Sequence, residues 1–268
     1  MLAGAAQAGA LQQAQALMLQ QRPSAAAAVL EAALKHDPQD AQAWYRLGLA
    51  RAASGHYPSA VDAYRLALGR DKDMAKAHCA LALALRESGR PVEALGAVER
   101  ALELEPLYVG AWNLKGNVLH DLDRDAAALE AYRKALSLQP SYAHARFNEG
   151  VALESLGRLD DALASYSQAV GSAPTLSEAW LGRGRMQLAA KELREAKASF
   201  QRATGLPGSE AQGRWGLSLV AAAAGQKAEA RRQEALYAAA QRRQDRSLEP
   251  AMSAYLPSAG LASADAAR

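Results

Sequence analysis

The stretch WYRLG (residues 44–48) returns as WNLKG (residues 112–116). The two stretches lie 68 residues apart, which is twice 34, and both place a tryptophan four residues before a glycine. Self-similarity at a fixed spacing is the signature of a repeat architecture. A period of 34 residues is therefore the first to test along the rest of the chain.

Five columns of residues keep this period. Steps of 34 from Ala60 and from Ala67 meet alanine each time, up to Ala196 and Ala203. The other three columns are small, bulky or proline-rich: Gly48, Ala82, Gly116, Gly150 and Gly184; Tyr64, Val98, Tyr132, Tyr166 and Phe200; and Pro38, Lys72, Pro106, Pro140 and Pro174. The sequence is thus an internal repeat.

The columns predict a pair of antiparallel helices in each repeat. Small residues let two helices cross closely, and the bulky column fills the space between neighbours. Gly55, Gly89 and Gly157 fall where a first helix would end, and a helix C-terminus favours a left-handed residue. The proline column stops the second helix and directs the chain to the next repeat.

The pattern W-x2-L-G, A-x3-Y, A and P at a 34-residue period resembles the tetratricopeptide repeat family. This resemblance implies an all-α fold, a right-handed α-solenoid of stacked antiparallel helix pairs. The solenoid is expected over 1–242, in repeats at 7–40, 41–74, 75–108, 109–142, 143–176 and 177–210 with a divergent unit at 209–242. Residues 243–268 are predicted to be a basic helix end followed, from Ser247, by a flexible Ala/Ser/Pro tail.

Composition excludes several classes of protein. The net charge of +3 over 268 residues is below the basic excess of a nucleic-acid binder, so no nucleic-acid partner is expected. No stretch approaches the ~20 apolar residues of a transmembrane segment. Residues 1–21 are uncharged, but they lack a basic start and are interrupted by glutamines, unlike a secretory leader. Abundant alanine and arginine favour a bacterial source, and we expect a cytoplasmic protein that meets membranes only through partners.

The resemblance also implies where a partner binds. In this family the first helices line a concave groove, with positions 2, 5, 6, 9, 12 and 13 of each repeat facing it. Carried over to this chain, these positions give a partner-binding surface of Tyr45, Arg46, Leu49, Lys76, Leu83, Arg86, Asn113, Asn117, His120, His144, Phe147, Asn148, Val151 and Arg185.

That surface suits a protein or peptide. Asparagine amides bond an extended backbone through both donor and acceptor, and Tyr45 and Phe147 offer apolar anchoring sites. Some members of the family hold a terminal carboxylate with cations around two asparagines. Asn117 and Asn148 match those two positions, but the cations do not follow, so this clamp is not expected.

No catalytic or cofactor motif is found. A phosphate loop is missing, and the acidic run that begins at Asp121 lacks the glycine and the closing glutamate of a calcium loop. His120 and His144 could approach each other across adjacent helices, but no third metal ligand presents itself. Cys79, the single cysteine, is expected to be a small apolar residue. We therefore expect no metal, no cofactor and no enzyme activity.

The sequence predicts a non-catalytic scaffold or adaptor that binds a peptide or helix of a partner protein in the groove. Self-association and membership of a larger complex are both compatible with it. One alternative is the N-terminal substrate-recognition module of a larger bacterial glycosyltransferase or sulfotransferase. A second is a peripheral subunit of a membrane-associated assembly, held through the basic last helix (Arg231, Arg232, Arg242, Arg243 and Arg246).

Overall fold

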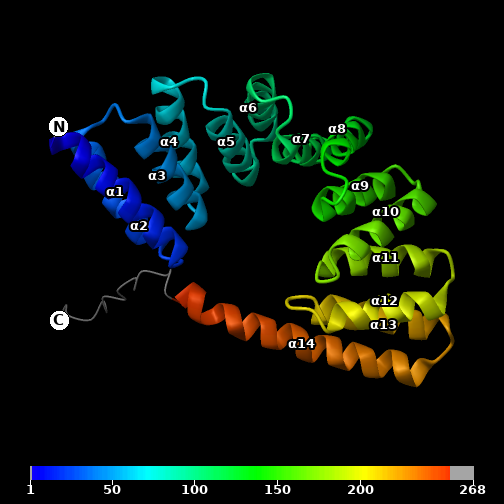
Figure 1. Ribbon diagram of the computed structural model, residues 1–268. Coiled ribbons are helices and arrows are strands. Elements are labelled where there is room, and N and C mark those ends of the chain that lie inside the picture. The colour runs from blue at the N-terminus through cyan, green and yellow to red at the C-terminus, as the bar shows by residue number, and fades with distance from the viewer. Residues whose placement is uncertain (1, 254–268) are drawn as a thin grey trace, which may run out of the picture. The chain divides into compact units, whose positions relative to one another are not determined.

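The computed structural model describes the backbone of residues 2–253 and the side chains of residues 9–245 (Figure 1). This part contains helices and no strand, which confirms the predicted all-α class. The helices are α1 (Leu2–Leu19), α2 (Pro23–His36), α3 (Ala41–Ala53), α4 (Tyr57–Arg70), α5 (Ala75–Glu87), α6 (Pro91–Leu104), α7 (Val109–Asp121), α8 (Asp125–Leu138), α9 (Ala143–Ser155), α10 (Leu159–Ser172), α11 (Ser177–Ala189), α12 (Leu193–Thr204), α13 (Glu210–Ala223) and α14 (Lys227–Ser253).

The 34-residue period of the sequence is the period of the helices. From α3 to α11, the odd-numbered helices begin at residues 41, 75, 109, 143 and 177. The even-numbered helices from α4 to α12 begin at 57, 91, 125, 159 and 193. Each repeat is therefore one helix pair, and we call its members the first and the second helix.

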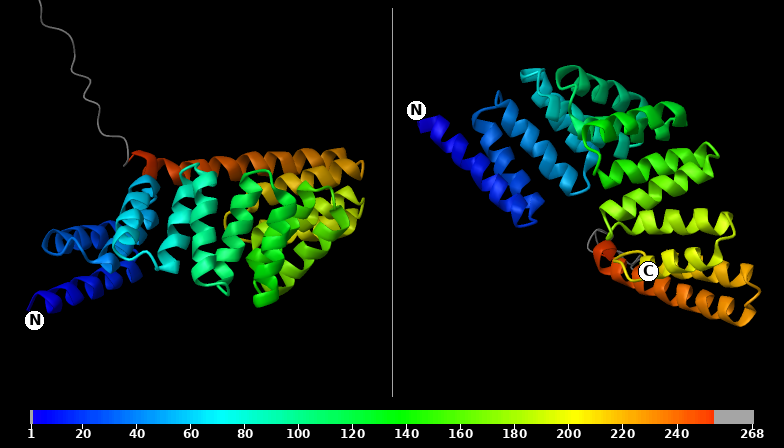
Figure 2. Two further views of the ribbon diagram at one scale, coloured as in Figure 1. Left: turned by 90° about the horizontal axis from the view of Figure 1, so that it is seen from above. Right: turned by 45° about the vertical axis from the view of Figure 1, so that its right-hand side comes forward.

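The chain divides into two compact units, Met1–Arg158 and Leu159–Arg268. Unit 1 holds α1 to α9 and unit 2 holds α10 to α14, and Figure 2 shows the helix pairs of each unit stacked side by side. Within each unit every helix packs on the helix before it and the helix after it. Each unit is therefore an α-solenoid.

Each unit curves toward its first helices. In unit 1, α1, α3, α5, α7 and α9 each contact the next first helix, and in unit 2 α11 contacts α13. Among the described residues, second helices of neighbouring repeats within a unit make no such contact. First helices are therefore closer together, and their shared surface, called here the first-helix face, is the inner side of the curve.

The small column exists because an aromatic ring occupies the space of a side chain. A Cβ on Gly48 would lie 2.4 Å from the ring of Tyr64, and one on Gly116 would lie 2.3 Å from the ring of Tyr132. Both tyrosines are almost completely buried. The two columns are thus the two sides of one contact between the first and the second helix.

A left-handed residue separates the first helix from the second in every repeat. Gly55, Gly89 and Gly157 take this conformation as predicted, with φ of 76°, 72° and 72°. Other residue types take it in the remaining repeats: Gln21, Asp123 and Lys191, with φ of 57°, 57° and 62°. In the last repeat it is Gly225, at a position that breaks the 34-residue step from Lys191.

The tryptophan column closes the link between repeats. The indole nitrogens of Trp44, Trp112 and Trp180 donate to the carbonyls of Pro38, Pro106 and Pro174 at 3.0, 2.8 and 3.0 Å. His78 stands at the same position, and its Nε2 lies 2.9 Å from the carbonyl oxygen of Lys72, also six residues earlier. A ring nitrogen thus holds the preceding turn in all four repeats.

The predicted tail is partly wrong. Helix α14 continues to Ser253, past Ser247 where the sequence was expected to leave regular structure. Alanine, glutamine and arginine favour the helix, and they carry its propensity beyond the last residue with a visible repeat pattern. Residues 254–268 lie outside the described part of the chain. No helix in the described part is both long and apolar enough to cross a bilayer.

Candidate functional site

The residues predicted to bind a partner fall into two sets. All but Arg185 lie on α3, α5, α7 and α9, and so belong to the first-helix face of unit 1. Arg185 lies on α11 in unit 2. The two faces are considered in turn.

The centre of the first-helix face of unit 1 is a cluster of asparagine amides. Asn148 Nδ2 on α9 donates to Asn113 Oδ1 at 3.0 Å and to Asn117 Oδ1 at 2.9 Å, both on α7. Tyr132 OH also donates to Asn117 Oδ1, at 2.9 Å. Burial raises the pKa of this phenol, so it stays protonated and remains a donor. The amides therefore bond to one another and link neighbouring repeats.

Tyrosines gather at one edge of this face, near the N-terminal ends of the first helices. The thiol of Cys79 on α5 interacts electrostatically with the phenols of Tyr45, Tyr108 and Tyr142. Burial raises the pKa of Cys79, an effect that a hydrogen bond from Tyr108 partly offsets. Burial and the neighbouring thiol raise the pKa of Tyr108 to about 12. At neutral pH this edge is a half-buried, uncharged surface of phenols and a thiol. Cys79 is a thiol without activation.

Charged groups gather at the opposite edge, near the C-terminal ends of the first helices. Arg86 on α5 donates through Nε to Asp121 Oδ2 on α7 at 2.5 Å and through a second nitrogen to Oδ1 at 3.3 Å. Another nitrogen of Arg86 reaches Glu87 at 3.0 Å. The carboxylates raise the pKa of Arg86 against the opposing effect of burial. This guanidinium is thus already engaged.

The two histidines have separate partners. His120 Nδ1 lies 2.5 Å from Asp125 Oδ1 at the start of α8, while the ring of His144 lies against Tyr142 with centroids 6.2 Å apart. The described residues contain no group of three side chains able to hold a metal ion.

Several predicted residues remain open to solvent. Leu49 and Leu83 are 36% and 45% exposed, and Lys76 is exposed beside them. Phe147 and Val151 on α9 are half-buried. Arg46 donates to Gln15 on α1 at 3.2 Å, a further link between neighbouring first helices. The face therefore combines accessible leucines with polar groups held in place by their neighbours.

The first-helix face of unit 2 is more apolar, and sequence reasoning missed its main residues. Trp215 and Leu219 on α13 are 47% and 39% exposed, and the ring of Trp215 lies 5.6 Å from that of Tyr237 on α14. Arg185 on α11 is exposed. The break in the 34-residue step was the signal: aligning the last repeat on Trp215-Gly216 and Gly225, rather than on the strict period, would have drawn attention to this helix.

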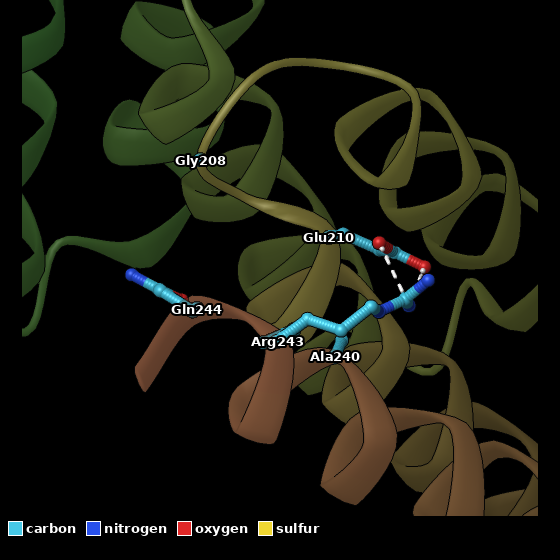
Figure 3. Close-up of a pocket in the computed structure, with 6 residues that line it drawn as sticks. Gly208, Glu210, Ala240, Arg243 and Gln244 are labelled. Atoms are coloured by element: carbon cyan, nitrogen blue, oxygen red, sulfur yellow. Dashed lines mark hydrogen bonds and ion pairs between the residues drawn. The ribbon is translucent and has the colours of Figure 1, made fainter. Parts of the chain in front are cut away.

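A second feature of unit 2 is a pocket between α14 and the turn before α13 (Figure 3). Its cavity of about 320 Å³ is crossed by an ion pair. One nitrogen of Arg243 lies 3.0 and 3.2 Å from the two carboxylate oxygens of Glu210. This pair fastens the last helix to the start of α13.

Comparison with solved structures shows the same fold. A tetratricopeptide repeat protein from Parabacteroides merdae is 16% identical, with a TM-score of 0.68 over 86% of this chain and 93% of that one. Pseudomonas aeruginosa pilF is 20% identical, with a TM-score of 0.67 over 78% and 96%. YrrB, described as a TPR protein with an unusual peptide-binding site, is 21% identical, with a TM-score of 0.53 over 69% and 95%. No curated protein sequence matched the chain.

The sequence model of the tetratricopeptide repeat matches residues 11–75, 79–143, 126–177 and 147–204. These matches cover most of the chain and span both units. The chain therefore belongs to the tetratricopeptide repeat family.

Proposed function

We propose that this protein is a non-catalytic interaction scaffold, and that the first-helix face of unit 1 binds an extended segment of a partner protein. The observation that carries the proposal is the amide cluster of Asn113, Asn117 and Asn148. Its internal bonds use one oxygen each of Asn113 and Asn117 and one nitrogen of Asn148. Within the described chain, Asn148 Oδ1 and the Nδ2 groups of Asn113 and Asn117 have no protein partner.

These remaining groups suit a peptide backbone. A backbone offers alternating donors and acceptors, and an amide side chain provides both. The neighbours of each amide fix its orientation, which lowers the entropy lost on binding. Leu49 and Leu83 add exposed apolar surface, and the half-buried tyrosines add amphipathic contact area of the kind enriched at interfaces.

The comparisons support this proposal at the level of the family. Tetratricopeptide repeats are in general non-catalytic scaffolds, and YrrB is described as having a peptide-binding site. The other residues predicted from the sequence, among them Arg46, Arg86 and His120, would act mainly by shaping the surface, because each already has a partner within the chain.

A matched pair of substitutions tests the proposal. Leu83→Arg places a charge on the exposed first-helix face, whereas Val92→Arg places the same charge on α6, where the native side chain is 73% exposed. Neither removes a core side chain. In affinity capture from source lysate, we expect a partner retained by the native chain and by Val92→Arg to be lost with Leu83→Arg, at unchanged helical content.

The opposite pattern, with the partner lost only from Val92→Arg, would place binding on the other face. A partner attached through the basic residues of α14 would survive both substitutions, as the membrane-assembly alternative predicts. Detection of the same reading frame continuing into a transferase would favour the recognition-module alternative. The bacterial cytoplasm is the location we infer for the scaffold.

A further inference from the structure

The largest feature outside the first-helix face of unit 1 is a groove between the second helices α6 and α8. It encloses a cavity of about 370 Å³, within the range of small-molecule and side-chain pockets. α7 forms its floor through Trp112 and Leu119, and α8 forms one wall through Ala127 and Ala131. The two alanines leave free space beside the indole of Trp112.

A salt bridge keeps this cavity open. Lys115 follows Trp112 by one helical turn, and its ammonium lies 2.9 Å from Glu99 on α6 and 5.8 Å from the centre of the Trp112 ring. The lysine is therefore held toward α6 and does not cover the indole.

The equivalent position in unit 2 shows the closed alternative. Arg183, 68 residues beyond Lys115, lies 4.2 Å from the ring centre of Trp180. Its Nε donates to Ser199, which stands where α8 has Ala131. Ser167 replaces Glu99, so no carboxylate draws the guanidinium away. In unit 1 the related cavity beside Trp44 is about 160 Å³, less than half as large.

The rim of the Trp112 groove carries an excess of positive charge. Lys115 and Glu99 neutralise each other. Arg124 and Lys134, at the two ends of the α8 wall, are exposed and have no ion-pair partner in the described part of the chain, and one carboxylate, Glu130, lies between them. An apolar cavity flanked by two unpaired cations is complementary to an apolar side chain flanked by carboxylates.

We infer that the groove between α6 and α8 is a second protein-binding site, which accepts an acidic segment of a partner with one large apolar side chain. That side chain enters the cavity beside Trp112, and its acidic neighbours pair with Arg124 and Lys134. The site is separate from the first-helix face, so the scaffold can hold two partners at once.

The four indole N–H groups provide a direct readout. In a two-dimensional NMR spectrum of 15N-labelled protein, each tryptophan gives one indole signal, and a Trp112→Phe variant assigns that of Trp112. The probe is a synthetic peptide with a central phenylalanine flanked by glutamates. We expect it to shift the Trp112 signal in a saturable way and to leave those of Trp44, Trp180 and Trp215 in place.

Two control peptides separate the contributions. A peptide with alanine in place of phenylalanine tests for binding by charge alone, and a peptide with lysines in place of the glutamates tests for binding by the apolar group alone. Each is expected to bind at least about tenfold more weakly, equivalent to about 1.4 kcal/mol. Equal shifts with all three peptides, or no shift of Trp112 with any, would overturn the inference.

Matched substitutions test the charges and the open state. Lys134→Glu should weaken the peptide about tenfold, whereas Arg202→Glu, the same change at the equivalent exposed position of unit 2, should leave its affinity unchanged. Glu99→Ser should also weaken it, because Lys115 is then released to cover Trp112. Equal effects of Lys134→Glu and Arg202→Glu would reduce the interaction to general charge attraction and refute the site.

Discussion

The two units have the same repeat but join neighbouring repeats differently. In unit 1 the first helices are linked by polar side chains: Gln15 with Arg46, Arg86 with Asp121, and Asn148 with two asparagines. In unit 2 a ring on a second helix contacts glycines of the next first helix. A Cβ on Gly182 would lie 2.7 Å from Tyr166, and one on Gly216 would lie 2.3 Å from Phe200.

This difference shows how one repeat can produce two kinds of surface. Polar links leave amides and charges on the face of unit 1, where they are available to a partner. Glycine–ring contacts satisfy the packing of unit 2 below the surface and leave Trp215 and Leu219 exposed. The first surface suits a peptide backbone, and the second suits an apolar side chain.

The largest expected effect is on the glycine contacts of unit 2. A Cβ on Gly213 would lie 2.9 Å from the backbone nitrogen of Thr204 and 3.0 Å from the carbonyl oxygen of Phe200. Because backbone cannot move aside cheaply, Gly213→Ala should cost about 3 kcal/mol of unfolding free energy. Urea denaturation followed by tryptophan fluorescence measures it.

Gly171→Ala is the matched control, since a Cβ added there would have no atom within 4 Å and the site is on the same unit. It should stabilise the protein by about 0.5–1 kcal/mol through helix propensity. Similar changes for both alanines would show that close packing does not join the repeats of unit 2.

The amide links of unit 1 should give the next largest effect. Asn148→Ala removes two hydrogen bonds and leaves the largely buried Asn113 without its donor, at a cost of about 2 kcal/mol. His144→Ala, at an exposed position of the same helix, should change the unfolding free energy by less than about 0.5 kcal/mol. Equal midpoints in urea for these two variants would mean that the amide cluster adds no stability.

Alkaline pH should affect unit 1 through its buried phenols. Burial raises the pKa of Tyr64 above its value of 10 in the unfolded chain, so the native state holds the proton longer. Its stabilising contribution is complete below pH 10 and falls above it, by up to about 1.4 kcal/mol per pH unit. The unfolding free energy should therefore fall above pH 10, and Tyr64→Phe should make that fall shallower. An unchanged slope in the variant would exclude Tyr64 as a cause.

The smallest effects concern the two cross-helix ion pairs. Arg86 and Asp121 in unit 1 have side chains 29% and 31% exposed, whereas Arg243 and Glu210 in unit 2 are 66% and 41% exposed. Solvent screens the second pair more, so double-mutant cycles should give about 0.5–1 kcal/mol for the first and less than about 0.5 kcal/mol for the second. A larger coupling energy for the unit 2 pair, or one insensitive to salt, would reverse this ranking.

The sequence predicted what depends on local repetition. Small residues opposite rings, a left-handed residue after the first helix and proline after the second are each written in one column, and the structure has all of them. His78 was predicted to replace a tryptophan, and its ring makes the same hydrogen bond to the residue six positions earlier.

The remainder depends on side chains from different repeats, which no column records. Nothing in the positions of Asn113, Asn117 and Asn148 shows that they bond to one another, or that Asp125 occupies His120. The exposed Trp215 was missed because the last repeat departs from the 34-residue register. Helix α14 passes Ser247 because helix propensity persists after the repeat pattern has ended.

The central claim is that the first-helix face of unit 1 binds the partner. Its most direct test is a photo-crosslinking amino acid placed at Leu83, with the same group placed at Val92 as the control, in cells that produce the protein. We expect position 83 to crosslink to one short segment of a single protein, and that product to disappear when Leu49 is changed to Arg. Crosslinks to that segment from position 92 and none from position 83 would contradict the claim.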